Sequence, residues 1–147
     1  MTQIFACAPF YSELVKQLTP NDHPSLLLLR NPKLQFFTRA LGAIDGSHII
    51  LAPPFFIRDA CHNQKGFFSQ NCLFCCSFNL LFTYALTGWE GSTADARVYA
   101  DAIQSDLKIP DGWYLLADAG FPHRKELLVP YHSVQYHLQE WGKASVQ

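Results

Sequence analysis

The 147-residue chain has little charge and almost no excess of either sign. Charged residues make up 16% of it, and the formal net charge is -1. A self-sufficient DNA-binding module is usually clearly basic, because neutralisation of phosphates dominates its affinity. The composition argues against such a module, so a basic surface for nucleic acid must be local or supplied by a partner.

The sequence also lacks long hydrophobic runs, internal repeats and low-complexity segments. The leucine run at residues 26–29 is far too short to span a bilayer, and the first ten residues have no basic signal-peptide region. We therefore expect no membrane segment and a soluble intracellular protein. With 49% hydrophobic and 14% aromatic residues, the chain is predicted to form one globular domain with a core of large side chains.

A disulfide framework is not indicated. The cysteines number five, an odd count, and three of them fall within residues 72–76. This pattern favours reduced, buried thiols. Cys72 and Cys75, together with His132 and His137, have the internal spacings of two zinc half-sites. The gap between the two pairs is far too long for a zinc finger, so core packing is the favoured interpretation.

The order of the expected elements indicates the fold class. Residues 1–40 contain four prolines and are predicted to be an irregular lead-in with short helices. Strands are expected at 43–51, 71–81, 81–87 and 114–117, with a tight turn near Asn79, a break at 88–91 and a turn at 110–112. A helix is expected to begin at 92–95 with a side-chain cap, and its apolar face would comprise Val98, Tyr99, Ala102 and Ile103. A second, short helix is expected around residues 125–128. This order is that of an α/β, ribonuclease H-like mixed sheet with flanking helices, in which the first and fourth strands pair at the centre.

Two aspartates lie in apolar, strand-like runs. Asp45 lies within residues 41–50 (LGAIDGSHII), and Asp118 ends the run that begins at Trp113. An ionised carboxylate inside a buried strand is costly unless it is neutralised, and two on neighbouring strands, about 5 Å apart, repel each other. A divalent cation between them removes both costs. The sequence therefore predicts Asp45 and Asp118 as ligands of Mg²⁺ or Mn²⁺ at a phosphoryl-transfer site.

Each of these acids could also be present for a reason unconnected with a metal. Asp45 and Asp118 each stand close to a glycine and could start a turn, although their strand context favours the ligand role. Asp95 is favoured in a first helical turn by the helix dipole whatever the function, so a metal role for it is the weaker prediction. His48 is more simply a packed histidine than a catalyst.

Four segments in order carry a resemblance to PIF/Harbinger-type DDE transposases. Residues 43–49 (AIDGSHI) resemble "IDGTHI", and residues 62–71 (HNQKGFFSQN) resemble "YNRKG…SQN". Residues 88–99 (GWEGSTADARVY) are similar to "GWEGSAHDSRVY", and residues 116–122 (LADAGFP) with 128–131 (LVPY) are similar to "GDSGYP…LVPY". Together they cover about residues 41 to 131.

The resemblance implies a metal-dependent nuclease and strand-transfer domain over residues 41–147 that works in the nucleus. It implies that Asp45 and Asp118 are catalytic, and it makes Asn63, Lys65 and Arg97 candidate contacts to nucleic acid. A Myb/SANT-like partner protein would supply DNA recognition, and a homo-oligomer is compatible with the family. DNA binding by the chain alone is expected to be weak.

Two departures from the family pattern shape these expectations. The family's third acid is a glutamate in an "R…IE..F" context, and neither Glu126 nor Glu140 has that context. Gln64 also replaces the arginine of "NRKG". We therefore expect a catalytic domain that is incomplete at its C-terminus and inactive as it stands. The alternative is a truncated or domesticated protein that acts as a non-catalytic binding module.

Overall fold

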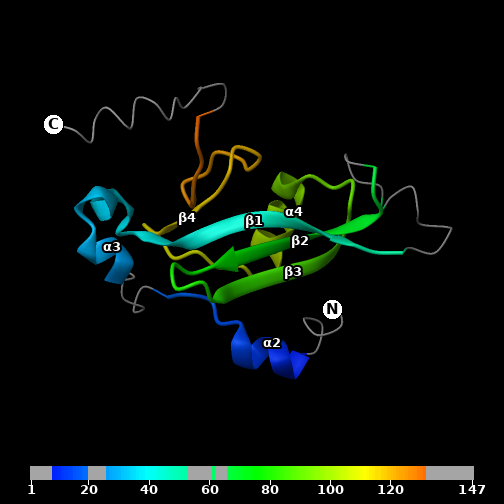
Figure 1. Ribbon diagram of the computed structural model, residues 1–147, viewed down its shortest axis with the longest axis horizontal. Helices are drawn as coiled ribbons and strands as arrows, with labels where there is room; N and C mark the ends of the chain where they lie inside the picture. Colours follow the sequence, from blue (N-terminus) through cyan, green and yellow to red (C-terminus); the bar gives the residue numbers. More distant parts are fainter. Residues whose placement is uncertain (1–7, 20–25, 53–60, 62–65, 132–147) are drawn as a thin grey trace.

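The computed structural model describes residues 8–19, 26–52, 61 and 66–131. These form a five-stranded mixed sheet of order β3-β2-β1-β4-β5 with helices around it (Figure 1). The strands are β1 (Ala40–Ile50), β2 (Ser69–Cys76), β3 (Phe82–Glu90), β4 (Tyr114–Leu116) and β5 (Leu127–Leu128). The helices are α2 (Ala8–Leu14), α3 (Leu26–Arg30), the 3-10 helix η1 (Pro32–Phe37) and α4 (Asp95–Ser105). The ribonuclease H-like α/β fold predicted from the sequence is confirmed, including the pairing of the first and fourth strands at the centre.

The first three strands form an antiparallel meander whose boundaries differ from the prediction. β2 ends at Cys76 because residues 77–81 form the turn, in which the Leu81 carbonyl accepts from Ser77 N at 2.9 Å. β3 continues to Glu90, through the break predicted at 88–91. Between the pairs Asn71–Trp89 and Leu73–Leu86, one residue of β2 lies opposite two residues of β3, and Gly88, with a φ of 99°, accommodates the extra residue as a bulge. Glycine therefore bends the strand here and does not end it.

Helix α4 begins later than its sequence pattern predicts. Its N-cap is Ala94, which makes no side-chain hydrogen bond, so the predicted side-chain cap is wrong. A turn, in which Thr93 N donates to the Glu90 carbonyl at 2.9 Å, precedes the helix. Val98, Tyr99 and Ala102 form the buried face, as expected, whereas Ile103 is 42% exposed. The apolar face is thus narrower than predicted, and it packs against β2 and β3.

The two short parallel strands complete the sheet beside β1. The predicted turn at 110–112 is confirmed, because Trp113 N donates to the Pro110 carbonyl at 3.0 Å. The helix expected around residues 125–128 is wrong. Leu127 and Leu128 instead form β5, with the Leu128 carbonyl accepting from Ala117 N at 3.0 Å. Pairing with β4 buries Leu127 more fully than a single helical turn on the surface would.

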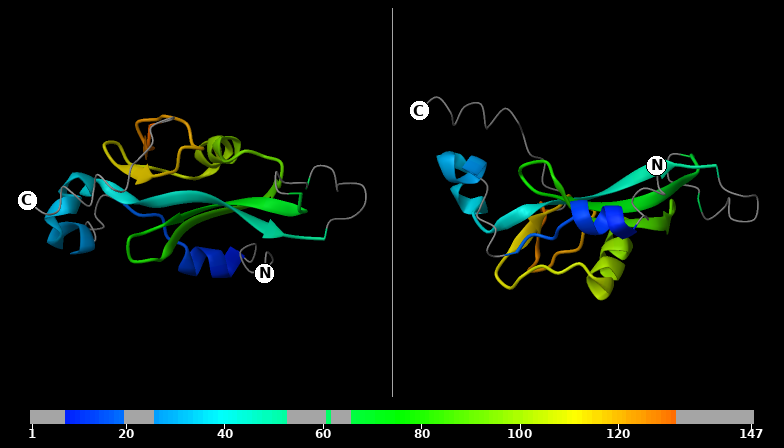
Figure 2. Two further views of the ribbon diagram at one scale, coloured as in Figure 1. Left: turned by 45° about the horizontal axis from the view of Figure 1, so that its top comes forward. Right: turned by 90° about the horizontal axis from the view of Figure 1, so that it is seen from below.

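The core lies mainly between the sheet and α4, which covers one face (Figure 2). On the edge of the sheet, α2 lies beside β3, where Ala85 N donates to the Tyr11 hydroxyl at 3.2 Å. The predicted buried thiols are confirmed for Cys61, Cys72 and Cys75, whereas the prediction is wrong for Cys76, which is only half-buried. Cys72 and Cys75 are three residues apart in β2, so their side chains point to opposite faces of the sheet. This arrangement suits packing and not the shared chelation of one zinc ion.

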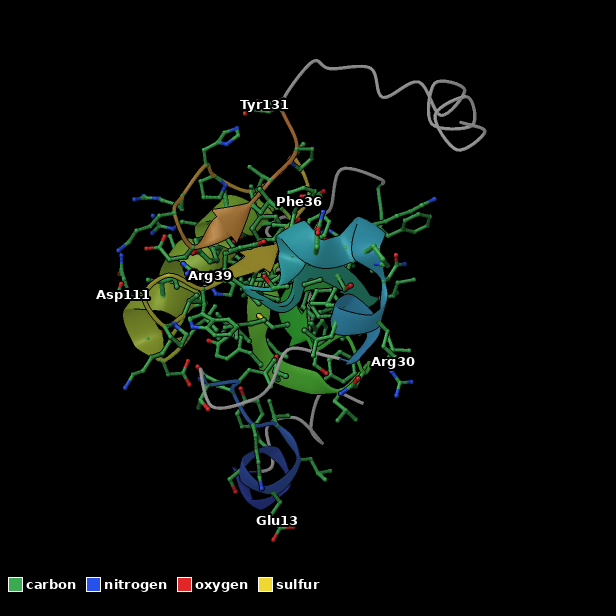
Figure 3. The ribbon with its side chains drawn as sticks, turned by 90° about the vertical axis from the view of Figure 1, so that its left-hand side faces the viewer. Glu13, Arg30, Phe36, Arg39, Asp111 and Tyr131 are labelled. Carbon is green, nitrogen blue, oxygen red and sulfur yellow. The ribbon has the colours of Figure 1, made fainter. Side chains whose placement is uncertain are left out.

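Short helices lead into β1 in the part of residues 1–40 that the structure describes. The Tyr114 hydroxyl donates to the Phe36 carbonyl at 3.0 Å, which ties η1 to the start of β4. Figure 3 views the molecule from this end, with Phe36 and Arg39 labelled on the segment that enters β1. None of the helices in the described ranges has the length and hydrophobicity required to cross a membrane.

Candidate functional site

Asp45 lies on β1, and Asp118 lies just beyond the end of β4, the parallel neighbour of β1. β1 and β4 run parallel, with Ala43 opposite Leu116. Asp45 lies two residues beyond Ala43, and Asp118 lies two residues beyond Leu116. Neighbouring strands are separated by about 5 Å. The sheet order therefore brings together two carboxylates that are 73 residues apart in the chain (118 − 45).

Both aspartates are exposed, which corrects the sequence-based expectation of buried carboxylates. β1 is buried at its start and as far as Ile44, and its exposed part begins at Asp45. Asp118 lies just beyond the end of β4. Partial desolvation still raises the pKa of Asp45, and the nearby carboxylates of Asp118 and Asp95 raise that pKa further. The hydrogen bond from Gly46 N opposes these effects. The pair is thus open to solvent and destabilised by its own like charge.

Backbone amides hold one oxygen of each aspartate. Gly46 N donates to Asp45 Oδ1 at 2.8 Å, and Gly120 N donates to Asp118 Oδ1 at 2.9 Å. Among the residues that the structure describes, neither carboxylate is paired with a cationic side chain. Clustered carboxylate oxygens without a cationic neighbour are the hard donors that Mg²⁺ and Mn²⁺ prefer. The donor chemistry of the pair therefore fits a divalent cation.

A third carboxylate approaches this pair from α4. Asp95, in the first turn of α4, lies against the backbone of β1, because a Cβ at Gly46 would overlap its carboxylate. Asn71 Nδ2 donates to Asp95 Oδ1 at 2.7 Å. Asp95 therefore makes specific contacts with β1 and β2, which a favourable interaction with the helix dipole alone would not require. In the described part of the chain, however, no three His, Cys, Asp or Glu side chains gather closely enough to form a complete metal-ligand set.

Of the other residues singled out in the sequence, some lie outside the described residues and some lie within them. Asn63 and Lys65 lie outside the described residues, as does Glu140. Arg97 is exposed in the first turn of α4, two residues after Asp95. His48 is exposed, which corrects the expectation of a packed histidine, and its Nδ1 lies within hydrogen-bond distance of Ser69 Oγ, at 3.0 Å.

Glu126 is separated from the aspartate pair. Its carbonyl accepts from Leu115 N at 3.0 Å, so Glu126 sits beside a residue three positions before Asp118. Three residues of extended chain span about 10 Å. Glu126 therefore lies toward the opposite end of β4 from Asp118 and cannot directly replace the family's third acid in this arrangement.

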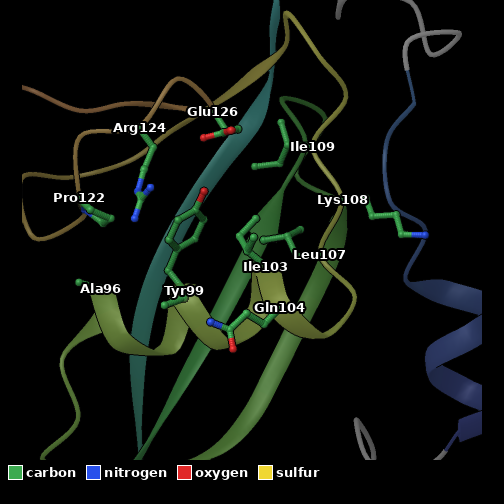
Figure 4. A pocket seen from close by; sticks show the side chains of 11 residues that line it. Ala96, Tyr99, Ile103, Gln104, Leu107, Lys108, Ile109, Pro122, Arg124 and Glu126 are labelled. Atoms are coloured by element: carbon green, nitrogen blue, oxygen red, sulfur yellow. The ribbon is translucent and has the colours of Figure 1, made fainter.

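A groove of about 540 Å³ lies between α4 and the segment that leads to β5. Tyr99 projects from α4 toward it, with Arg124 and Glu126 on the opposite wall (Figure 4). Burial raises the pKa of Tyr99 to about 12. None of Asp45, Asp95 and Asp118 lines this groove, so it is separate from the acids.

Sequence reasoning missed two residues of this region, Gly46 and Asn71. Gly46 admits Asp95 to the surface of β1, and Asn71 binds the Asp95 carboxylate. Asn71 lies in the segment at residues 62–71 that resembles the transposase pattern, and this was the one signal that could have identified it.

Residues 44–145 match the family model described as DDE superfamily endonuclease. The matched segment covers more than half of the chain and includes all three acids, Asp45, Asp95 and Asp118. Comparison with curated proteins and with solved structures gave no match.

Proposed function

This chain belongs to the DDE superfamily endonuclease family, and we propose that it is a transposase-derived domain of the PIF/Harbinger type. In this proposal, Asp45 and Asp118 hold a divalent cation, Mg²⁺ or Mn²⁺, for phosphodiester cleavage and strand transfer. The observation that supports it most strongly is that Asp45 and Asp118 each lie two residues beyond a pair of partner residues, Ala43 of β1 and Leu116 of β4. The sequence around each aspartate also supports this assignment, but only because it resembles the corresponding motif of the transposase family.

In such a site the protein's task is to fix charge and position. Asp45 and Asp118 extend from two hydrogen-bonded strands, and backbone amides of Gly46 and Gly120 orient one oxygen of each. A bound divalent cation would supply activation of the attacking hydroxyl and charge stabilisation at the phosphate. Asp95 would add a third carboxylate from α4. Arg97, which is in the same turn of α4 as Asp95, would contact a DNA phosphate. Asn63 and Lys65 would do the same.

We propose that catalysis by this chain alone is slow. The family's glutamate in its usual context is missing from the 147 residues, and Glu126 lies away from the aspartate pair. Loss of one charged group that positions reactants typically costs about 100-fold or more in rate. The same observations favour a second candidate function, namely a non-catalytic module that binds DNA or protein through the same surface.

DNA recognition would then depend on other molecules. A net charge of -1 gives the chain no general attraction for DNA, and the acidic pair repels phosphate until a cation binds. We propose that a Myb/SANT-like protein supplies sequence recognition, that the complex acts in the nucleus, and that a second copy of the chain takes part in assembly.

Calorimetric titration with Mn²⁺ tests the assignment of the site. The metal-free chain is compared with Asp45→Asn and Asp118→Asn, each of which removes one charge with little change in shape. Asp111→Asn serves as the matched control, because Asp111 is exposed and pairs with Lys125. We expect each site variant to bind Mn²⁺ at least about tenfold more weakly and the control to bind as the wild type does. Indistinguishable titrations of the wild type and both site variants would refute the assignment.

A further inference from the structure

The side chain of Asn71 connects the centre of the sheet to the first turn of α4. Asn71 lies on β2, opposite His48 of β1, and is only 1% exposed. Its Nδ2 donates to Asp95 Oδ1 at 2.7 Å and to the Thr93 carbonyl at 2.9 Å. One buried amide therefore binds both the connection before α4 and the first acid of that helix.

We infer that Asn71 is a positioning residue, which holds the Asp95 carboxylate against Gly46, the residue after Asp45, so that the second oxygen of Asp95 is available as a further ligand for the divalent cation. This inference rests on the proposed function, because it needs the cation that Asp45 and Asp118 hold. It adds a specific role for a buried neutral residue that does not itself touch the cation.

The hydrogen bonds of Asn71 fix which way its amide faces. If the amide were turned over, Oδ1 would face the Thr93 carbonyl and the Asp95 carboxylate, which are both acceptors. With Nδ2 facing them, Oδ1 is buried and has no hydrogen-bond partner among the residues described. A buried carbonyl without a partner is unfavourable, and a leucine of similar size would avoid it. The amide is thus retained at a cost, which points to a need for its two donors.

Two glycines allow the Asp95 turn to come this close to the sheet. A Cβ at Gly46 would overlap the Asp95 carboxylate. A Cβ at Gly91 would lie 2.5 Å from the Ser69 carbonyl, which is also too close for a side chain. The connection from β3 to α4 therefore lies directly on β1 and β2 at this point. Asp95 is held from both sides, by the backbone of Gly46 and by the amide of Asn71.

This arrangement also determines which oxygen of Asp95 is available. Oδ1 accepts from Asn71, whereas Oδ2 makes no hydrogen bond within the described ranges. Because Gly46 directly follows Asp45, the Asp95 carboxylate lies beside the backbone of the residue that we assign as the principal ligand. Groups that hydrogen-bond to a metal ligand and orient it typically lower the metal affinity by about 10- to 100-fold when they are removed.

A double-mutant cycle in Mn²⁺ affinity separates positioning from simple structural support. The variants are Asn71→Leu, Asp95→Asn and the combination, each titrated calorimetrically and each unfolded in urea. We expect Asn71→Leu and Asp95→Asn to weaken Mn²⁺ binding about tenfold each. We expect the double variant to bind no more weakly than Asp95→Asn alone, because Asn71 acts only through Asp95.

Two control variants accompany the cycle. Thr83→Val removes a buried hydroxyl at the other end of the β2–β3 ladder and should leave Mn²⁺ affinity unchanged. Asp101→Asn removes a charge from the same helix, where Asp101 accepts from Trp89 Nε1 at 3.2 Å, and should also bind as the wild type does. Equal weakening by either control would mean that general destabilisation, and not Asp95, explains the effect, and would overturn the inference.

The remaining outcomes also decide the question. Wild-type affinity in Asn71→Leu, or full additivity with Asp95→Asn, would overturn the positioning role while leaving Asp45 and Asp118 as ligands. Mn²⁺ binding that is insensitive to Asp45→Asn would overturn the proposed function itself. If Asn71→Leu fails to fold, Gly46→Ala tests the same geometry, because it displaces Asp95 and leaves the buried amide intact. It should lose about tenfold in affinity, and unchanged affinity would contradict the inference.

Discussion

Asp45 and Asp118 each lie two residues beyond the paired residues Ala43 and Leu116, Asp45 on β1 and Asp118 just past the end of β4. Pairing of β1 with β4 at the centre of the sheet therefore brings the two aspartates close together, although Asp118 stands in the segment that follows β4. Their mutual repulsion remains in the absence of a cation, and this has consequences for stability that can be measured.

We predict that Asp45→Asn stabilises the metal-free protein at neutral pH. The pKa of Asp45 is raised in the folded state by desolvation and by Asp118 and Asp95. A raised pKa means that the folded state binds the proton more tightly than the unfolded state does. Ionisation of Asp45 therefore lowers stability as the pH rises from the ordinary aspartate range through the raised pKa. Because the side chain is exposed, the gain should not exceed about 1 kcal/mol.

Thermal unfolding with a chelator, at pH 7 and at pH 3, measures this effect. The advantage of Asp45→Asn should be present at pH 7 and disappear at pH 3, where the carboxyl is protonated in both states. Mn²⁺ should reverse the order at pH 7, because only the wild type gains stability from binding. An Asp45→Asn protein that is less stable than the wild type at pH 7 without metal would contradict the like-charge interpretation.

Two cysteines of β2, Cys72 and Cys75, should be inert in the native protein. Burial raises the pKa of Cys75 to about 12 and also raises that of Cys72. The thiolate is the reactive form, so both residues should react with a thiol reagent only after unfolding. Half-buried Cys76 should react first among these three, as followed by mass spectrometry of peptides. Protection of Cys72 and Cys75 that a zinc chelator abolishes would instead support the zinc interpretation.

Much of this fold could be predicted from the sequence, because strand and helix periodicity is local. The order of elements identified the sheet, and motif context identified Asp45 and Asp118. The exposure of these aspartates could not be predicted, since apolar neighbours such as Ile44 and Ile49 suggested a strand buried throughout. The strand at Leu127 and Leu128 was missed because two residues carry no periodicity, and their pairing with β4 is a tertiary contact.

The contacts of Asn71 could not be predicted from the sequence either, because they are also tertiary contacts. A polar residue in a strand gives no indication of its partner, and Asp95 is 24 residues further along the chain. The close approach of Gly46 to Asp95 likewise depends on how α4 packs on the sheet. Local patterns therefore singled out Asp45 and Asp118 as candidates, whereas the contacts of Asp95 with Asn71 and Gly46 required the three-dimensional structure.

DNA binding by the isolated chain should be weak, sequence-independent and strongly dependent on salt. Fluorescence anisotropy with short duplexes should give a dissociation constant in the range of about 10⁻⁴ to 10⁻⁶ M at physiological salt. Arg97→Gln and Lys65→Gln should weaken binding to all sequences equally and reduce the salt dependence. Arg30→Gln, on α3, is the matched control and should have no effect. Sub-micromolar, sequence-selective binding by the chain alone would contradict this prediction.

The chain alone should not cleave DNA at a useful rate. A supercoiled plasmid incubated with Mg²⁺ or Mn²⁺ should show no nicking beyond that of the Asp118→Ala variant, because no glutamate in the family context completes the site. Rapid nicking that disappears in Asp118→Ala would overturn the prediction. It would mean that Glu140 or a second chain supplies the third acid, or that Glu126 moves to the aspartate pair when DNA and metal bind, and the variants Glu126→Gln and Glu140→Gln would then distinguish these sources.

The location of the bound cation tests the central claim most directly. Fe²⁺ that occupies a Mg²⁺ site generates hydroxyl radicals with ascorbate and peroxide, and these cut the polypeptide close to the ion. We predict cuts that cluster around Asp45 and Asp118, with a weaker cluster near Asp95, and that fade when Mg²⁺ competes or when Asp45 is changed to Asn. Cuts that fall elsewhere, or that persist unchanged in Asp45→Asn, would contradict the assignment of these aspartates as the metal-binding pair.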